Sequence, residues 1–305
     1  MGLAQYLDNK AQERFNKRIQ AYFNNAAADI KLPSLSKKEF RLAENKIWYK
    51  AQDSGELYKF YKQRFDMDTG YYNQNHFYKS IDNNPDLVLQ HFNLSQQIVY
   101  AISNLTFGKE PTISVIDGNK QTAKKLQSQL DDIYSDNKKM PFLLDAARKL
   151  SYSGAVGIML NLNEFVSKYP IMQAYPKENI DVLRTYGRIS DIIFKDYYDV
   201  GNNKTLTLYS IYGRGYIKYK LVREGYNQAT GTSIIEELPL DTLPQTADLE
   251  DCYFKYSDGT PYDKIFAVYV ENKDGRSSYE GCIDDFISID ENYSQFETFI
   301  RNSGL

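Results

Sequence analysis

Apolar residues recur at helical spacing near the start of the chain and again after a break that contains a proline. The first repeat has charged residues between its members, which are Leu7, Ala11, Phe15, Ile19 and Phe23. This spacing predicts an amphipathic helical arm over residues 1–37. The pattern stops around Pro33 and resumes from Lys38, which predicts another helix. The polar, turn-rich residues 67–86 are expected to form a loop or short hairpin.

A stronger helix pattern begins at Asn93, which is suited to cap a helix. Gln96 stands three residues later, at the capping-box position. The predicted apolar face consists of Leu94, Ile98, Ala101, Ile102 and Leu105. Beyond Gly108 and Pro111, we predict a short strand at 112–116 and a helix at 121–134. A further helix follows, with Pro141 in its first turn.

Residues 151–162, SYSGAVGIMLNL, place Gly154 and Gly157 between a predicted helix and a predicted strand. Phosphate-binding loops have the opposite order, because their glycines follow a strand and open a helix whose N–H groups face the phosphate. A nucleophile elbow requires G-x-S-x-G at a strand-to-helix turn, and this stretch lacks it. We therefore interpret Gly154 and Gly157 as a structural corner where small residues allow close approach.

The chain becomes β-rich beyond residue 169. Strands are predicted at 189–197, 205–212 and 216–222, and the glycine-containing turn at 213–215 makes the last two a hairpin. Within it, Lys218 and Lys220 alternate with apolar residues, and we assign both lysines to the solvated face of a half-buried sheet. Another β-segment is predicted at 264–271.

The last segment has apolar residues at alternating steps of four and three, which is the pattern of helices that pack together. The predicted helix of about 20 residues would be roughly 30 Å long. We assign to a subunit-packing stripe the residues Phe286, Ile289, Tyr293, Phe296 and Ile300. The opposite side, which we expect to face solvent or a channel, carries Asp284, Ser288, Glu291 and Gln295.

The composition limits the class of protein. The 305 residues are 42% hydrophobic and 25% charged, as in soluble globular proteins, and the 27 tyrosines favour half-buried strands and protein interfaces. A net charge of -3, with basic residues interspersed among acids, disfavours a protein that grips a phosphate backbone. No apolar run has the length of a membrane span, and charges interrupt the N-terminal residues, so neither a membrane protein nor a cleaved secretory signal is expected.

No residue pattern predicts catalysis. Cys252 and Cys282 have no metal-binding spacing, and His76 and His91 stand in neither a triad nor a metal motif, so we interpret both histidines as ordinary loop or helix residues. Asp284 and Glu291 share a helix face, but no third carboxylate or histidine is evident nearby in the sequence. We therefore predict no enzyme activity, no catalytic or metal-binding residue and no cofactor.

Four segments, in their order and spacing, resemble the SPP1-type portal proteins of tailed bacteriophages. They are ISNLTFGKEPTISV (102–115), LSYSGAVGIMLNL (150–162), AYPKENIDVLRTYGRISDIIFKDYY (174–198) and GRSSYEGCIDDFISIDENYSQFETFIR (275–301). The resemblance covers most of the chain from about residue 40 onward. It implies an α+β fold with a helical arm at 1–37, a portal-type wing of helices and mostly antiparallel sheet at 38–275, and a stem helix at 276–305.

The resemblance also implies a function and a set of partners. Portal proteins form a ring, usually dodecameric, at one capsid vertex of the virion after assembly in the host cytoplasm. Double-stranded DNA passes through this ring without sequence-specific binding. The implied partners are the terminase motor, the major capsid and scaffolding proteins, and a neck or tail adaptor. Portals of this type continue into a clip, a second stem helix and a crown, so we expect this chain to be either a truncated portal or a naturally short relative.

Two other classes of protein remain open. One is an α+β hydrolase or nuclease whose site is drawn from scattered Asp, Glu and Tyr residues. The other is a virion adaptor or minor capsid protein, which would share tyrosine-rich surfaces but would need no channel helix. The acidic side of the last helix is compatible with a channel, because an acidic or neutral lining avoids the phosphate contacts that would hold DNA.

Overall fold

A computed structural model of the chain describes residues 37–65, 77–81, 86–163, 166–201, 205–227 and 232–303. Its helices are α2 (Lys37–Lys50), α3 (Ser54–Phe65), α4 (Phe77–Ser80), α5 (Leu94–Thr106), α6 (Lys120–Asp136), α7 (Lys139–Ser153) and α8 (Ile283–Ser303). Its strands are β1 (Ala155–Asn161), β2 (Ile171–Pro176), β3 (Ile180–Thr185), β4 (Arg188–Asp199), β5 (Thr205–Gly213), β6 (Tyr216–Asn227), β7 (Thr232–Leu238), β8 (Cys252–Tyr253) and β9 (Ala267–Glu271).

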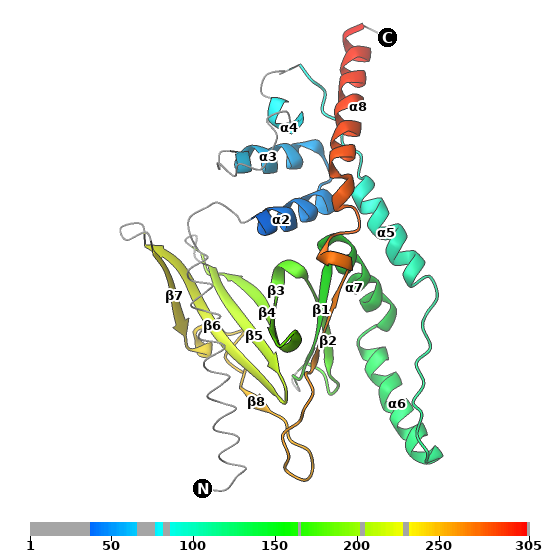
Figure 1. Ribbon diagram of the computed structural model, residues 1–305, viewed down its shortest axis with the longest axis vertical. Coiled ribbons are helices and arrows are strands. Elements are labelled where there is room, and N and C mark those ends of the chain that lie inside the picture. The colour runs from blue at the N-terminus through cyan, green and yellow to red at the C-terminus, as the bar shows by residue number, and fades with distance from the viewer. Residues whose placement is uncertain are drawn as a thin grey trace. The chain divides into compact units, whose positions relative to one another are not determined.

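The predicted α+β class with a C-terminal helix is confirmed (Figure 1). The predicted arm lies outside the described residues except for Lys37, which begins α2. The same holds for most of the loop or hairpin expected at 67–86, within which residues 77–80 form the short helix α4.

The chain divides into two compact units that alternate along the sequence. Of the described residues, the larger unit contains those within 37–194, 212–216 and 253–303, and the smaller one contains those within 195–211 and 217–252. The boundaries predicted at residues 37 and 275 stay a prediction. The two units are described separately below.

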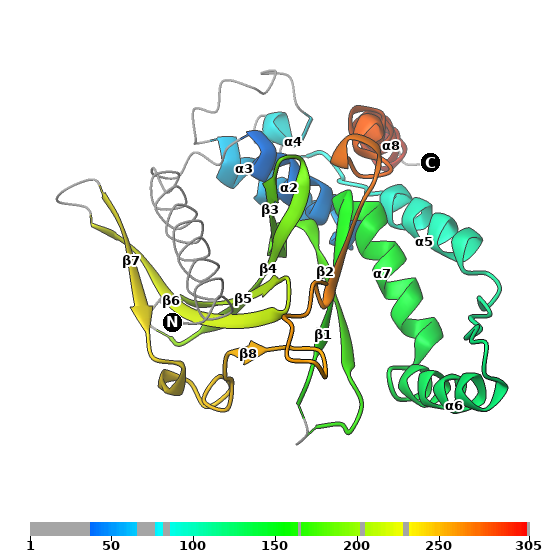
Figure 2. The ribbon, with the colours of Figure 1, turned by 60° about the horizontal axis from the view of Figure 1, so that its bottom comes forward.

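A three-stranded antiparallel sheet and the helix α7 form one part of the larger unit. The strand order is β2-β1-β9, and α7 packs against β1 and β2 (Figures 1 and 2). The helix ends at Gly154, whose φ of 84° lies in the left-handed region that favours glycine at a helix C-terminus. The chain then enters β1 directly, as the sequence order of helix, glycine and strand predicts.

The corner at Gly154 and Gly157 is closely packed. A Cβ atom on Gly157 would lie 2.7 Å from Cε1 of Phe194 and 2.8 Å from Cδ1 of Ile180, and one on Gly154 would meet the backbone of Gly275. The backbone that leads to α8 is bonded to this corner. Asn272 N–H donates to the Gly154 carbonyl at 2.9 Å, and Ser278 N–H donates to the Ser151 carbonyl at 2.8 Å. The glycines thus make room for the segment that positions α8.

An aromatic core joins the N-terminal helices of the larger unit to α8. Its fully buried members include Trp48, Leu57, Tyr61, Tyr78 and Val99, and Tyr279, Phe286 and Ile287 pack into the same cluster. The buried tyrosine hydroxyls need polar partners. The Trp48 indole donates to the Tyr61 hydroxyl, which in turn donates to the Glu44 carboxylate. The core therefore contains an internal polar network.

The helix α5 forms as predicted, and Leu94 and Ile98 of its predicted apolar face pack against the aromatic core, but the rest of that face and the predicted cap are wrong. Its buried residues are Ser95, Val99 and Ser103, whereas Ile102 and Leu105 are exposed. Each serine hydroxyl donates to a backbone carbonyl, Ser95 to Trp48 and Ser103 to Val99, so these small side chains are buried without an unpaired hydroxyl. Asn93 makes no capping bond to the backbone, and its amide N–H donates to the Gln96 side chain.

The strand predicted at 112–116 is also wrong. These residues form no strand. Their backbone groups instead form hydrogen bonds with the side chain of a glutamine in α6. Gln127 accepts a hydrogen bond from Val115 N–H at 2.8 Å and donates one to the Ile113 carbonyl at 3.2 Å. An amide side chain can make both bonds because it has an acceptor and a donor at one end.

A six-stranded sheet contains the remaining strands in the order β3-β4-β5-β6-β7, and β8 pairs with β6. The predicted hairpin of β5 and β6 is confirmed. In the smaller unit, Leu206, Leu208, Leu221 and Leu243 form the core. The solvated position predicted for Lys218 is wrong, because this side chain is buried along with its neighbour Ile217. Alternation of polar and apolar residues predicts a solvated face only where a sheet is covered on one side. Here residues on both faces of β6 are buried.

Candidate functional site

The helix α8 presents one side to its own chain and another side to solvent. Its buried residues are Ile283, Phe286, Ile287, Asp290 and Ser294. The predicted stripe is therefore divided: Phe286 lies in the core, Ile300 is half-buried, and Ile289, Tyr293 and Phe296 are exposed. Phe299, which the sequence analysis did not select, is 65% exposed. We call the residues Ile289, Tyr293, Phe296 and Phe299 the apolar strip.

The positions predicted to face solvent or a channel lie mostly on the surface. Asp284, Ser288 and Gln295 are exposed, and Glu291 is half-buried. The Gln295 amide donates to the Glu291 carboxylate at 3.2 Å, one helical turn away. Their assignment to a channel stays a prediction.

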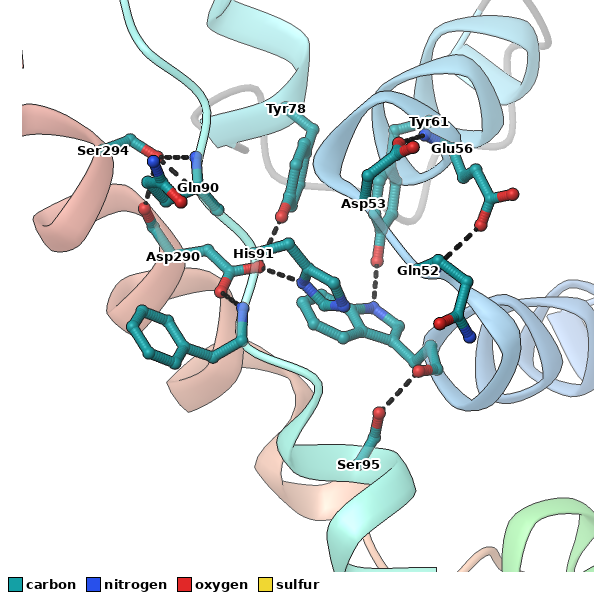
Figure 3. Close-up of polar contacts among 12 residues, drawn as sticks. Gln52, Asp53, Glu56, Tyr61, Tyr78, Gln90, His91, Ser95, Asp290 and Ser294 are labelled. Carbon is teal, nitrogen blue, oxygen red and sulfur yellow. Dashed lines mark hydrogen bonds and ion pairs between the residues drawn. The ribbon is translucent and has the colours of Figure 1, made fainter. Parts of the chain in front are cut away.

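The feature of α8 that the sequence analysis missed is the buried carboxylate of Asp290. This residue is fully buried and accepts bonds from three directions (Figure 3). The Tyr78 hydroxyl donates to Oδ2 at 2.5 Å, the Phe92 N–H donates to Oδ1 at 2.9 Å, and His91 Nδ1 lies 2.7 Å from Oδ2. Because an ionised carboxylate only accepts, Nδ1 is the ring nitrogen that carries the proton in this contact.

Two more polar side chains of α8 bind the same segment of backbone. The Ser294 hydroxyl accepts from Gln90 N–H at 2.9 Å, and the Thr298 hydroxyl accepts from Val88 N–H at 2.8 Å. Together with Asp290, these residues form what we call the polar ladder. Its members stand four residues apart on the helix, a rise of about 6.0 Å, and meet alternate residues of an extended backbone, about 6.6 Å apart. The near match of the two spacings lets three successive bonds form.

The surroundings of the polar ladder are aromatic. The Trp48 ring lies 5.4 Å from the His91 ring and 5.8 Å from the Phe286 ring, measured between centroids. Burial, and then the charge of Asp290, raise the pKa of the Tyr78 hydroxyl well above its usual range. Tyr78 therefore stays a neutral donor at any physiological pH. A sequence clue to this arrangement existed, since Asp290, Ser294 and Thr298 are short polar residues on one helix face.

The His91–Asp290 pair has the composition of a catalytic dyad but not the access. Both side chains are 1% exposed, and His91 Nε2 makes no hydrogen bond to the described residues. A substrate would have to displace the aromatic core to reach this nitrogen. The interpretation of His91 as an ordinary residue is thus too simple, because its ring joins the segment before α5 to α8.

Other kinds of site receive little support from the described residues. Within these ranges, no three His, Cys, Asp or Glu side chains gather in a way that could hold a metal ion. No helix of the described chain has both the length and the apolar character needed to cross a membrane. The chain matches no protein-family model and no curated protein. What α8 does is therefore inferred from its residues and contacts.

Proposed function

We propose that the chain is a subunit of a bacteriophage portal ring and that α8 packs against other copies of itself around the channel. The observation that carries this proposal is the division of α8. The polar ladder holds one side of the helix to its own chain, while the apolar strip on another side lies in solvent. The family resemblance of residues 102–115, 150–162, 174–198 and 275–301 points to the same role.

The apolar strip has the composition of a protein interface. Phe296 and Phe299 are 56% and 65% exposed, and Ile289 and Tyr293 add to the same side. Exposed apolar patches that persist on a folded protein mark surfaces that another molecule covers, and aromatic residues are enriched there. Because α8 has 21 residues, it is about 30 Å long and offers the strip along much of that length.

The charged side of the helix suits a channel through which DNA moves. Ser288 and Gln295 are exposed on this side and Glu291 is half-buried, and no ion pair of the described residues includes Glu291. Such a surface repels a phosphate backbone instead of binding it. On this proposal DNA passes without sequence-specific contacts, terminase supplies the ATP hydrolysis, and capsid, scaffolding and tail proteins dock outside the channel. The protein resides at the capsid vertex, after assembly in the host cytoplasm.

Electron microscopy of the purified full chain tests this proposal. We expect rings with a central hole from the native protein and from Gln295→Asp, which adds a carboxylate on the polar side of α8. We expect Phe296→Asp to prevent ring formation, because it would bury an unpaired charge between subunits. Intact rings from Phe296→Asp would exclude the proposed packing of α8.

Two results would favour the other classes. A monomer with divalent-metal-dependent nuclease activity that is lost in Asp284→Ala or Glu291→Ala would support an enzyme. A protein that binds a preformed ring but makes none by itself would support a virion adaptor or minor capsid protein.

A further inference from the structure

The tip of the β3–β4 hairpin presents a tyrosine between two arginines. The strands pair as far as Thr185 and Arg188, which leaves Tyr186 and Gly187 as a two-residue turn. Both turn residues have positive φ, 51° for Tyr186 and 76° for Gly187. Tight hairpin turns of this kind favour asparagine or aspartate before the glycine. A tyrosine is therefore an unfavourable choice for forming the turn.

The Tyr186 side chain contributes nothing to the described fold. Its exposed area is 102% of the reference value, so its ring packs against no neighbour. A residue that is neither favourable for the turn nor buried requires another explanation. Positive-φ residues other than glycine that persist in a fold occur preferentially at functional positions.

The two arginines beside the turn are exposed, and the charge of Arg184 also acts on the Tyr269 hydroxyl of β9, whose pKa is raised by burial and lowered by this charge. None of the ion pairs or hydrogen bonds among the described residues includes the side chain of Arg184 or Arg188. Arg188 is paired with Thr185 and Arg184 with Ile189, so the two arginines project from opposite faces of the ribbon. The tip thus carries one ring at its end and one guanidinium on each face.

We infer that this tip docks on the first turn of α8 in a second copy of the chain, with Arg184 and Arg188 binding Asp284 and Asp285. The inference rests on the proposed function, because it requires self-assembly. Tyrosine and arginine, together with tryptophan, are enriched among the residues that dominate the binding energy of protein interfaces. This composition favours a protein partner over nucleic acid.

The first turn of α8 complements the tip in charge and shape. Asp284 and Asp285 are exposed and belong to none of the described ion pairs. As consecutive helix residues they diverge by about 100° around the axis, so arginines on opposite faces of a ribbon can reach one carboxylate each. Ile289 lies one turn beyond Asp285 and is 40% exposed, which offers an apolar contact for the Tyr186 ring. A contact between two different surfaces repeats from copy to copy and can close a ring.

A substitution at Tyr186 separates folding from docking. Asparagine tolerates positive φ better than tyrosine, so Tyr186→Asn should fold at least as stably as the native chain. We expect it to weaken self-association of the full chain by about tenfold or more in sedimentation, because it removes an interface aromatic. Weaker association together with undiminished thermal stability would not arise from a structural role of the ring. Unchanged association would overturn the inference.

Charge reversal tests the partner. Arg184→Glu with Arg188→Glu, and Asp284→Lys with Asp285→Lys, should each weaken assembly, and the protein that carries all four substitutions should recover it. The control Arg214→Glu alters an exposed arginine at the β5–β6 turn and should leave assembly unchanged. Failure of the four substitutions to restore assembly would reject α8 as the partner.

Two further outcomes are distinguishable. If the native chain is monomeric at all concentrations, both the proposed function and this inference fail. If rings form normally but the double arginine variant loses binding to a labelled DNA duplex, only the inference fails, and the tip is a nucleic-acid contact.

Discussion

Removal of the Asp290 carboxylate should detach α8 from the segment before α5. The carboxylate is fully buried and holds Tyr78 O–H, Phe92 N–H and His91 Nδ1–H, so Asp290→Ala leaves three buried donors without their acceptor. One unsatisfied buried donor costs about 1–3 kcal/mol, and more where the lost acceptor was charged. Because these costs are not additive, we expect a loss of about 4 kcal/mol in the free energy of unfolding. Asp290→Asn keeps one acceptor and should lose less.

The only tryptophan of the chain provides the assay. Trp48 lies 5.4 Å from the His91 ring, so its fluorescence during urea unfolding reports on this cluster. Asp285→Asn is the matched control, because it removes an exposed carboxylate of the same helix and should change stability by less than about 1 kcal/mol. In a double-mutant cycle, Asp290→Ala and Tyr78→Phe should cost less together than the sum of their separate effects. A loss no larger for Asp290→Ala than for Asp285→Asn would refute the role of the polar ladder.

Three further predictions concern other parts of the larger unit. Gly157→Val should lower the free energy of unfolding by about 1–3 kcal/mol through contact with Phe194 and Ile180, whereas Gly118→Val, at a position with open space, should change it little when both are measured by urea titration. Glu291→Lys should leave rings intact but slow DNA packaging in a salt-dependent way, and equal rates at two salt concentrations would contradict this. Burial raises the pKa values of Tyr152 and Tyr279 above the usual range, and burial with the Glu271 charge raises the pKa of Tyr269 to about 12. Since an unfolded tyrosine ionises near pH 10, the contribution of these three residues to stability should be constant below about pH 10 and fall as the pH rises toward 12, and their share of the tyrosinate absorbance should appear only as the protein unfolds.

The sequence predicted the elements whose patterns are local. The helical spacing at 121–134 and after residue 281, and the glycine-containing turn between β5 and β6, each depend on neighbours within a few residues, and all three elements form. The order of helix, glycine and strand at Gly154 likewise needs no distant partner. Such patterns follow the periodicity of a helix or strand, and that periodicity can be read from residues close together in the sequence.

The errors concern contacts between distant segments. Asp290 meets Tyr78 and Phe92, which lie 212 and 198 residues earlier, so no local pattern distinguishes it from the exposed acids beside it. The fully buried residues of α5 were missed because two of them are serines, whose hydroxyls donate to backbone carbonyls. Lys218 was assigned to solvent because polar and apolar residues alternate in this strand. That alternation does not reveal that both faces of the sheet are covered. Burial of polar residues depends on partners that only the folded chain brings together.

The polar ladder also fixes the position of α8 along its own axis. A shift by one turn, about 6 Å, in one direction would bring Phe286 opposite Phe92 N–H, which would then face a ring that accepts no such bond. A shift in the other direction would place Ser294 opposite Phe92 and keep hydroxyl acceptors on the backbone, but it would withdraw the carboxylate from Tyr78 and His91. Intermediate shifts would break every bond of the ladder together, because its members share one spacing. Axial force on α8 is therefore passed to residues 88–92, and from there to α5, before the helix can slide.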